Sequence, residues 1–371
     1  MMQKKRVKQG DIIIGKPLQW DAFDEHDKLL LKEGSIIQSE FQLNALLNRG
    51  LYIRSRLENQ FSDVDHQNRC PFEAFADTYE RLEFIFCRGE AEKNFSSKIR
   101  DIGKILQQYY KQDANASLAA LLFCEESKYP FIHSVHTALM CEVTLHALEW
   151  PPEERLSTIA AALTMNIAIF QFQERLLSQK GPLNERQRQE IQNHPIRGCD
   201  ILRGLGVTDQ VWLDAVLGHH ERLDGSGYPR ALKGDDISVP ARVVAIGDLY
   251  CAKISSRAYR KSLLPSNALR QLFLETPQKI DGSIVKLLIK KIGMYPPGTF
   301  VELNNGEIAV VTQVGEEVQY PVLKSVVGMS GTPRTTPLFR DCRAEEFRIK
   351  KIIGQSDVGI EVNRYILWGY T

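Results

Sequence analysis

The sequence has no excess of charge of either sign and no long apolar run. Its 371 residues carry 47 Lys and Arg against 46 Asp and Glu, a net charge of +1. This balance gives no reason to expect nucleic acid or an anionic membrane as a partner. No run of eighteen apolar residues occurs, which argues against a membrane-spanning helix. We therefore expect no nucleic-acid partner and no insertion into a membrane.

Cysteines at the spacing of a metal ribbon or a disulfide framework are also missing. The seven cysteines are scattered along the chain and no CxxC occurs. Free thiols in a reducing cytoplasm are the simplest explanation. The basic segment Met1 to Gly10 is followed by no apolar stretch with a cleavage site, so we expect no signal peptide and a cytoplasmic protein.

Residues 1–56 are predicted to form a small N-terminal α+β domain. Asp11–Gly15 and Leu29–Leu31 are short apolar runs typical of strands, and apolar residues then recur at helical spacing from Phe41 to Leu46. Residues 57–70 are polar and without periodicity, which indicates a linker.

Residues 71–293 are predicted to form an all-helical domain, because helical periodicity dominates and strand patterns are nearly absent. Prolines near expected helix starts support this, since the first helical position needs no amide hydrogen. These prolines are Pro130, Pro151, Pro195 and Pro240. The long helical region from Phe72 to Gln108 makes a homodimer a candidate assembly, although such helices more often pack inside their own domain.

Residues 294–371 are predicted to form a small β domain. Thr299–Leu303 and Ile308–Thr312 flank an Asn-Gly pair ending at Gly306, which predicts a hairpin. Further strands are predicted at Val318–Leu323, Phe347–Ile353 and Ile360–Leu367. The predicted fold is therefore mainly α, with a central helical domain between a small N-terminal α+β domain and a small C-terminal β domain.

Histidines gather in the helical region. Six of the eight lie there: His133, His136, His146, His194, His219 and His220. His219 and His220 follow an apolar helical pattern and precede a glycine-rich turn, so both imidazoles can face one metal or polar ligand. Two solvated histidines at a surface helix end are the alternative, and spacing alone does not decide between them.

Asp248 is a second candidate, because it lies on the apolar face of a predicted helix. A buried carboxylate needs a metal, a cation or hydrogen-bond donors. Pairing with Arg242 or Arg257 is the purely structural alternative. The glycine-rich segment Asp224–Pro229 is not a phosphate loop, because it lacks the Walker lysine and a preceding strand.

A longer pattern joins these residues. The chain runs His219-His-Glu-Arg-Leu-Asp-Gly-Ser-Gly-Tyr-Pro229 and continues through Asp248-Leu-Tyr250 to Ser256-Arg-Ala-Tyr-Arg260, with His133-Ser134 and Asn193-His194-Pro195 upstream. Over roughly residues 125–290 the chain resembles the HD-GYP family, whose usual pattern is HHExxDGxGYP. The loop residues that carry the likeness are Asp224, Gly225, Gly227, Tyr228 and Pro229. The N-terminal segment resembles, more weakly, a small domain that often precedes HD-GYP domains.

The resemblance implies a bacterial helical phosphodiesterase that hydrolyses cyclic di-GMP. Such proteins use two or three metal ions, often iron or manganese, to activate water. The implied ligands are His133 and Asp248 for one metal and His194, His219 and His220 for another. Arg257 and Arg260 would face the phosphate of the ligand, and a solvated or salt-bridged turn is the alternative for these two arginines.

The central family pattern, LLHDxGK, is absent. The corresponding stretch Leu163–Ile169 places Met165, Asn166 and Ile169 at the positions of the His ligand, the bridging Asp and the Lys. Asn offers one neutral carbonyl oxygen and a competing NH2 group, and a thioether suits iron or manganese poorly in such a site. We therefore expect no full binuclear centre, but either no metal or a single divalent ion (Zn, Fe or Mn).

Three functions stay open. The first is a catalytically inactive HD-GYP-like protein of cyclic di-GMP signalling, which senses the nucleotide or docks a diguanylate cyclase or other partner through the loop Asp224–Pro229. The second is an active, metal-dependent cyclic di-GMP phosphodiesterase that uses the remaining His and Asp ligands. The third is a structural or interaction protein without nucleotide binding. Metal content, turnover and nucleotide binding separate the three.

Overall fold

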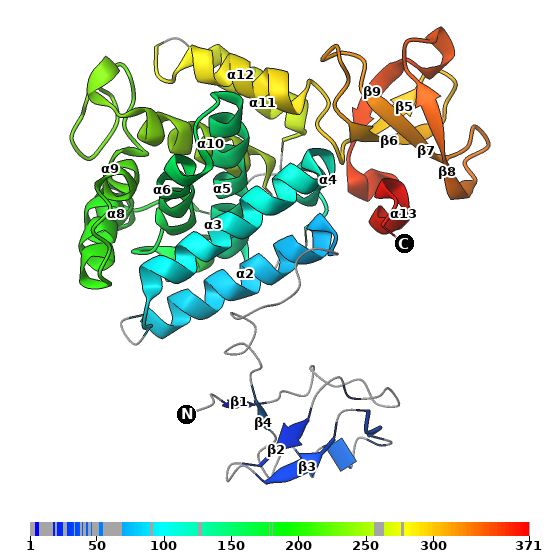
Figure 1. Ribbon diagram of the computed structural model, residues 1–371. Coiled ribbons are helices and arrows are strands. Elements are labelled where there is room, and N and C mark those ends of the chain that lie inside the picture. Colours follow the sequence, from blue (N-terminus) through cyan, green and yellow to red (C-terminus); the bar gives the residue numbers. More distant parts are fainter. Residues whose placement is uncertain are drawn as a thin grey trace. The chain divides into compact units, whose positions relative to one another are not determined.

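The computed structural model describes most of residues 69–371 and short segments of residues 1–68. In the larger part, residues 90–91, 125–127, 178, 180, 256–262, 276–277 and 371 are not described; the N-terminal part is described at residues 4–6, 18, 21–24, 28–32, 34–37, 39, 42–43, 46 and 52–54. The chain divides into two compact units, residues 1–68 and residues 69–371 (Figure 1). The predicted strand at Asp11–Gly15 lies outside the described residues.

The smaller unit contains a four-stranded antiparallel sheet in the order β1-β4-β2-β3. Its strands are β1 (Lys4–Arg6), β2 (Ala22–Phe23), β3 (Leu29–Leu31) and β4 (Tyr52–Arg54). The strand expected at Leu29–Leu31 is therefore present. Leu18, Ala22, Ile37 and Leu43 form a small apolar core of this unit.

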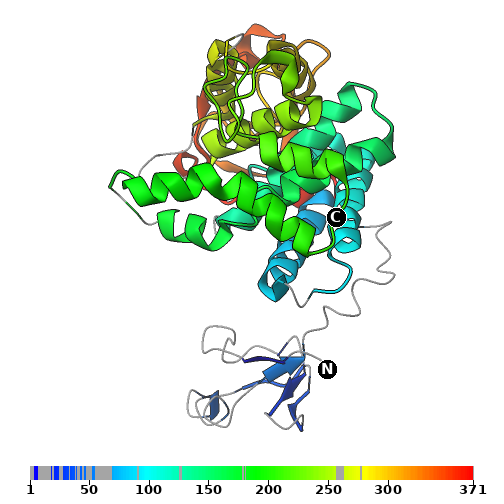
Figure 2. The ribbon, with the colours of Figure 1, turned by 90° about the vertical axis from the view of Figure 1, so that its left-hand side faces the viewer.

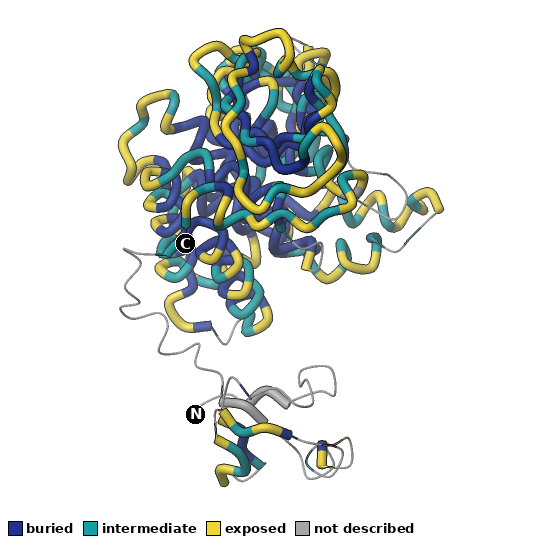
Figure 3. Tube along the Cα trace, turned by 90° about the vertical axis from the view of Figure 1, so that its right-hand side faces the viewer, coloured by how far each residue is buried: buried dark blue, intermediate teal, exposed yellow. Residues whose placement is uncertain are grey.

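Helices dominate the larger unit (Figures 1 and 2). They are α2 (Pro71–Arg88), α3 (Phe95–Gln112), α4 (Ala114–Ala120), α5 (Tyr129–Ala147), α6 (Pro152–Thr164), α7 (Phe170–Leu177), α8 (Glu185–Gly204), α9 (Gln210–Gly218), α10 (Val239–Ile254), α11 (Pro265–Glu275), α12 (Gly282–Ile292) and α13 (Arg364–Trp368). Helix α5 is buried at every residue from Tyr129 to Leu145, because α2, α3, α6, α10 and α12 all contact it. The buried residues gather along these contacts, and exposed residues surround them (Figure 3).

Helix α8 lies at one edge of the helical part (Figure 2). It begins at a reciprocal capping box, in which Asn184 and Gln187 each bond the other's backbone amide through their side chains. The sequence analysis placed Pro195 near a helix start, and this is wrong, because the capping box starts the helix ten residues earlier. Pro195 is instead buried inside α8, directly after His194.

The C-terminal part forms a five-stranded antiparallel sheet in the order β8-β7-β6-β5-β9. Its strands are β5 (Phe300–Leu303), β6 (Ile308–Gln313), β7 (Val322–Val327), β8 (Pro333–Asp341) and β9 (Ile349–Ile353). The predicted hairpin is confirmed, because β5 pairs with β6 across the turn at Gly306. Phe300 and Val310 belong to the core shared with the helices, whereas Val301 and Val311 belong to a separate core.

Two strand predictions near the C-terminus need correction, and one strand was missed. The strand expected at Val318–Leu323 begins only at Val322, and β8 was not predicted. The segment Ile360–Leu367 contains no strand, because the Asn363 side chain accepts the amides of Tyr365 and Ile366 and starts α13 there. Trp368 then hydrogen-bonds Thr312 O through its indole N–H, which fixes α13 against the sheet.

The mainly α fold with a C-terminal β part is confirmed. The boundaries predicted at residues 56, 70 and 293 stay predictions. Within the described part of the chain, no helix is long and apolar enough to cross a membrane. All seven cysteines are free thiols, as expected from their spacing.

Candidate metal centre and adjoining cleft

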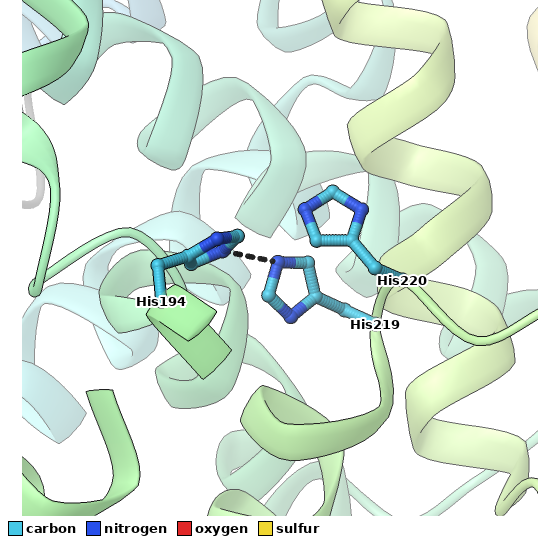
Figure 4. A group of neighbouring side chains, drawn as sticks. All are labelled: His194, His219 and His220. Carbon is cyan, nitrogen blue, oxygen red and sulfur yellow. Dashed lines mark hydrogen bonds between the residues drawn. The ribbon is translucent and has the colours of Figure 1, made fainter. Parts of the chain in front are cut away.

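Three histidines from two elements converge in the helical part. His194 comes from the middle of α8, whereas His219 and His220 directly follow α9. One ring nitrogen of each lies within 4.8 Å of the others (Figure 4). His194 and His219 are both 1% exposed, and His220 is half-buried. The structure therefore brings together the three residues that the resemblance assigned to one metal.

The backbone fixes the orientation of two of these rings. Proline has no amide hydrogen, so Pro195 leaves the carbonyl of Ile191 without its usual helical donor. His194 Nδ1 donates to that carbonyl at 2.6 Å, and His219 Nδ1 donates to Val216 O at 2.6 Å. The Nδ1–H to carbonyl arrangement is typical of metal-binding histidines, because it fixes the tautomer that leaves Nε2 free as a ligand.

The two free Nε2 atoms face each other. Burial lowers the pKa of His194 to about 3, and it also lowers the pKa of His219. Both rings are therefore neutral at pH 7 with their one proton on Nδ1, so the 3.2 Å contact between His194 Nε2 and His219 Nε2 joins two lone pairs. Two nitrogens bound to one tetrahedral zinc at about 2.0–2.1 Å lie roughly 3.3 Å apart. The chemistry and spacing of this cluster fit a single divalent cation.

His220 is held by the loop that follows it. Its ring stacks on Tyr228, with ring centroids 4.7 Å apart and an interplanar angle of 28°. Burial and the neighbouring His219 lower the pKa of His220 well below its ordinary value, so it too is a neutral ligand. Gly227 is required for this packing, because a Cβ there would lie 2.5 Å from Glu221 Cα.

Buried polar groups hold the Asp224–Pro229 loop in place. The Glu221 carboxylate is 3% exposed and accepts the amides of Arg230 at 2.7 Å and Leu232 at 3.0 Å. Arg242 pairs with Asp235 and Asp281, at 2.9 and 3.2 Å. Arg242 is therefore not the partner of Asp248 that the structural alternative required.

His133 and Asp248 form a pair of their own. His133 Nε2 donates to Asp248 Oδ1 at 2.7 Å, across the contact of α5 with α10. Burial opposes ionisation of Asp248, but the hydrogen bond from His133 and the electrostatic interaction with His133, His220 and His219 hold its pKa below the ordinary value. His133 Nδ1 is buried without a hydrogen-bond partner among the described residues. The Asp248 carboxylate therefore interacts electrostatically with His133 and also with His219 and His220 of the histidine cluster.

The residues predicted to replace the family's central pattern form a buried turn after α6. Met165, Asn166 and Ile169 are 0%, 4% and 5% exposed. The Met165 carbonyl lies beside Gly198, one helical turn beyond His194 on the same face of α8. The preceding Thr164 accepts the indole N–H of Trp212 at 2.7 Å, which joins this turn to α9. The turn therefore lies next to the histidine cluster.

A cleft of about 1030 Å³ lies between the helices and the C-terminal sheet. Residues of α5, α10, β5 and β9 line it, among them Tyr129, His136, Ile254, Phe300 and Ile353. The Tyr129 ring also stacks on His133, at 5.4 Å between centroids and 17° between planes. Tyr129 therefore connects the cleft to the His133–Asp248 pair.

Comparison with known proteins gives the family. Residues 111–284 match the family model of the HD domain. The chain is 29% identical over 211 residues to cyclic di-GMP phosphodiesterase PA4108 of Pseudomonas aeruginosa, covering 57% of this chain and 51% of that protein. It is 25% identical over 244 residues to cyclic di-GMP phosphodiesterase PdeB of Borreliella burgdorferi, covering 65% and 64%. Residues 111–284 are therefore similar to an HD domain, and both relatives are named as cyclic di-GMP phosphodiesterases.

A solved structure shows the same fold. Bd1817, an HDGYP protein from Bdellovibrio bacteriovorus, superposes with a TM-score of 0.53 at 18% identity, covering 77% of this chain and 98% of that one. The present chain spans about half to two thirds of the length of the two curated relatives. The HD-GYP likeness inferred from the sequence is thereby confirmed.

The structure adds residues to the site that the sequence did not indicate. The Ile191 carbonyl and the cleft residues Tyr129 and His136 carry no distinctive motif, and the hydrogen bonds of Glu221, the Glu of the HHExxDGxGYP pattern, could not be read from that pattern. Only Pro195 directly after His194 could have indicated that a backbone carbonyl would be freed. The predicted ligand contacts Arg257 and Arg260 lie outside the described residues and stay predictions.

Proposed function

We propose that this HD-GYP protein binds a cyclic dinucleotide as a regulatory module and does not hydrolyse it. The observation that carries the proposal is the turn with Met165, Asn166 and Ile169, which lies next to the histidine cluster. It provides no carboxylate, imidazole or ammonium group where the family pattern has all three. A bridging carboxylate would supply negative charge and two oxygens to a metal pair, which a neutral amide does not replace.

The His133–Asp248 pair supports the same proposal. His133 Nε2 donates to Asp248 Oδ1 at 2.7 Å, which supplies the carboxylate with a hydrogen bond that does not depend on a metal ion. The three-histidine half can hold one divalent ion through His194, His219 and His220. Such an ion, when bound, polarises a phosphate oxygen or lowers the pKa of bound water.

Cyclic di-GMP is the ligand that the comparisons favour, because both curated relatives are named for its hydrolysis. The cleft is large enough, since ligand pockets measure roughly 300–1,000 Å³. Ser255 and Leu263, which stand on either side of residues 256–262, both line it. Arg257 and Arg260 lie outside the described residues, and their contact with a phosphate of the ligand is proposed from the sequence resemblance alone.

The Asp224–Pro229 loop is the proposed docking element for a protein partner such as a diguanylate cyclase. Its inner residues are used internally, since Tyr228 stacks on His220 and Gly227 packs against Glu221. Asp224 and Ser226 are exposed, so they are the side chains that this proposal offers to a partner.

A second candidate is a phosphodiesterase that works with one metal. The convergence of three neutral histidines favours it, because such a cluster can activate a water molecule on one ion. Asp248, which acts electrostatically on His219 and His220, would then stabilise positive charge at this centre.

Metal content and turnover on one sample separate the two candidates. The protein is purified without chelator, its metals are counted by mass spectrometry, and cyclic di-GMP binding and hydrolysis are followed with and without added Mn²⁺ or Fe²⁺. Nucleotide binding with at most one metal and no turnover supports the regulatory module. Turnover that is lost in His219→Ala but kept in His146→Ala, a change at an exposed histidine of α5, would establish the enzyme instead.

A further inference from the structure

One wall of the cleft carries a buried histidine that the metal centre does not use. His136 on α5 lines the cleft and is only 2% exposed. Its Nε2 lies 2.8 Å from the hydroxyl oxygen of Tyr79 on α2. The two rings meet edge to face, with centroids 5.7 Å apart. His136 is therefore held in a fixed orientation by a residue outside the HD motif.

The hydrogen bond to Tyr79 decides which nitrogen of His136 carries the proton. Burial raises the pKa of Tyr79 well above its ordinary value, so the phenol keeps its hydrogen. Within the described part of the chain this hydroxyl bonds only His136, so satisfying it requires that it donate to Nε2. Burial, and then the neighbouring His133, lower the pKa of His136 to about 3, so the ring is neutral. Its single proton is consequently on Nδ1, which has no partner among the described residues.

The surroundings of His136 suit the uncharged part of a ligand. Most of the lining is apolar, as with Ile132, Leu264 and Ile353. The described lining residues include no lysine and no arginine, so these walls offer nothing to a phosphate. An apolar cleft with few placed polar groups is typical of sites that bind a flat ring and recognise its polar edge.

We propose that His136 is a specificity residue of the cleft, donating its Nδ1–H to the 6-oxo group of a purine base. Tyr79 is a positioning residue, which holds the imidazole in the tautomer that donates into the cleft. This inference rests on the proposed nucleotide binding. It places a purine base of the nucleotide in the cleft and attributes a preference for 6-oxo over 6-amino purines to one hydrogen bond from His136. A 6-amino group at the same place would present hydrogens to another donor and is disfavoured.

Three cyclic dinucleotides test this preference directly. Cyclic di-GMP, 3′3′-cGAMP and cyclic di-AMP carry two, one and no 6-oxo groups, and the dissociation constant of each is measured with the full-length protein by calorimetry. The wild-type protein is expected to bind them in that order of decreasing affinity. His136→Phe is expected to weaken cyclic di-GMP binding about 10-fold, the loss of one buried hydrogen bond, and to leave cyclic di-AMP within about 2-fold.

Further variants separate the hydrogen bond from packing. In His136→Asn the amide nitrogen takes nearly the place of Nδ1, so this variant is expected to keep most of the preference for cyclic di-GMP. Tyr79→Phe is expected to reduce the preference without abolishing it, because the second tautomer becomes accessible. His146→Phe, at an exposed position of the same helix, is the matched control and is expected to bind all three ligands as the wild type does.

The possible outcomes separate a failure of the proposed nucleotide binding from a failure of the proposed role of His136. If the wild-type protein binds none of the three ligands, the proposed function fails. If it binds them but His136→Phe keeps the wild-type preference, nucleotide binding stands and the role of His136 is refuted. Thermal unfolding of each variant checks folding, and Tyr79→Phe decides the question if His136→Phe does not fold, because an unchanged preference for cyclic di-GMP in Tyr79→Phe would refute the role of His136.

Discussion

Metal binding to the histidine cluster should release clearly fewer than two protons at pH 6. Three unperturbed histidines, with a pKa of about 6.5, would together hold about two protons at this pH and would release them on binding. Burial instead lowers the pKa of His194 to about 3 and lowers those of His219 and His220 in the same direction. Because burial favours the neutral rings, clearly fewer than two protons are expected to leave per Zn²⁺ bound.

Calorimetry in buffers with different ionisation enthalpies measures this number. The apparent binding enthalpy is plotted against the buffer ionisation enthalpy at pH 6, and the slope gives the protons released. His220→Ala is expected to abolish binding, whereas His146→Ala is expected to match the wild type. A slope near two protons would refute the reasoning, since it would mean that the rings are charged and solvated in the metal-free protein.

Three further predictions concern His136, Gly227 and the turn that contains Met165 and Asn166. Burial lowers the pKa of His136 in the folded protein to about 3, below its ordinary value of 6.5. The free energy of unfolding is therefore highest above pH 6.5 and decreases towards pH 3, as His136 takes up a proton in the unfolded chain only. In denaturant titrations, His136→Phe should show a smaller decrease than the wild type, by up to about 1.4 kcal/mol per pH unit. Gly227→Ala should weaken Zn²⁺ binding more than 10-fold, since its Cβ would meet the backbone of Glu221, whereas Gly204→Ala, which meets nothing, should leave it unchanged. Met165→His combined with Asn166→Asp should raise the metal count from one to two per chain by mass spectrometry, and an unchanged count would show that this turn is not what limits the site.

The sequence predicted the metal cluster better than its surroundings. Adjacent His219 and His220 stand in a long pattern, so their convergence with His194 followed from the resemblance. The cleft could not be foreseen, because its walls come from residues as distant as Leu121 and Glu361, which only the packing of the sheet on the helices brings together. His136 belongs to no motif of the quoted pattern, and a histidine in an apolar helix gives no signal that distinguishes a core position from a binding one.

The C-terminal errors have a similar origin. Ile360–Leu367 has the apolar residues of a strand, and nothing in that composition excludes one. What decides the outcome is the Asn363 cap together with the burial of Leu367, which is 0% exposed. Local propensity is a weak predictor where tertiary contacts of this kind compete with it.

The charge of the site supports the proposal that the residues Met165, Asn166 and Ile169 favour ligand binding without hydrolysis. Among the described ligands only Asp248 is negative, because His133 donates to it and the pKa values of the three clustered histidines are lowered by burial. Two divalent ions would place four positive charges against this single carboxylate, and uncompensated buried charge is costly. One divalent ion leaves a net charge of about +1, which a phosphodiester of charge −1 neutralises. Under the proposed function, the neutral Asn166 would therefore exclude a second metal, and a bound phosphodiester would balance the charge of a site that holds one divalent ion.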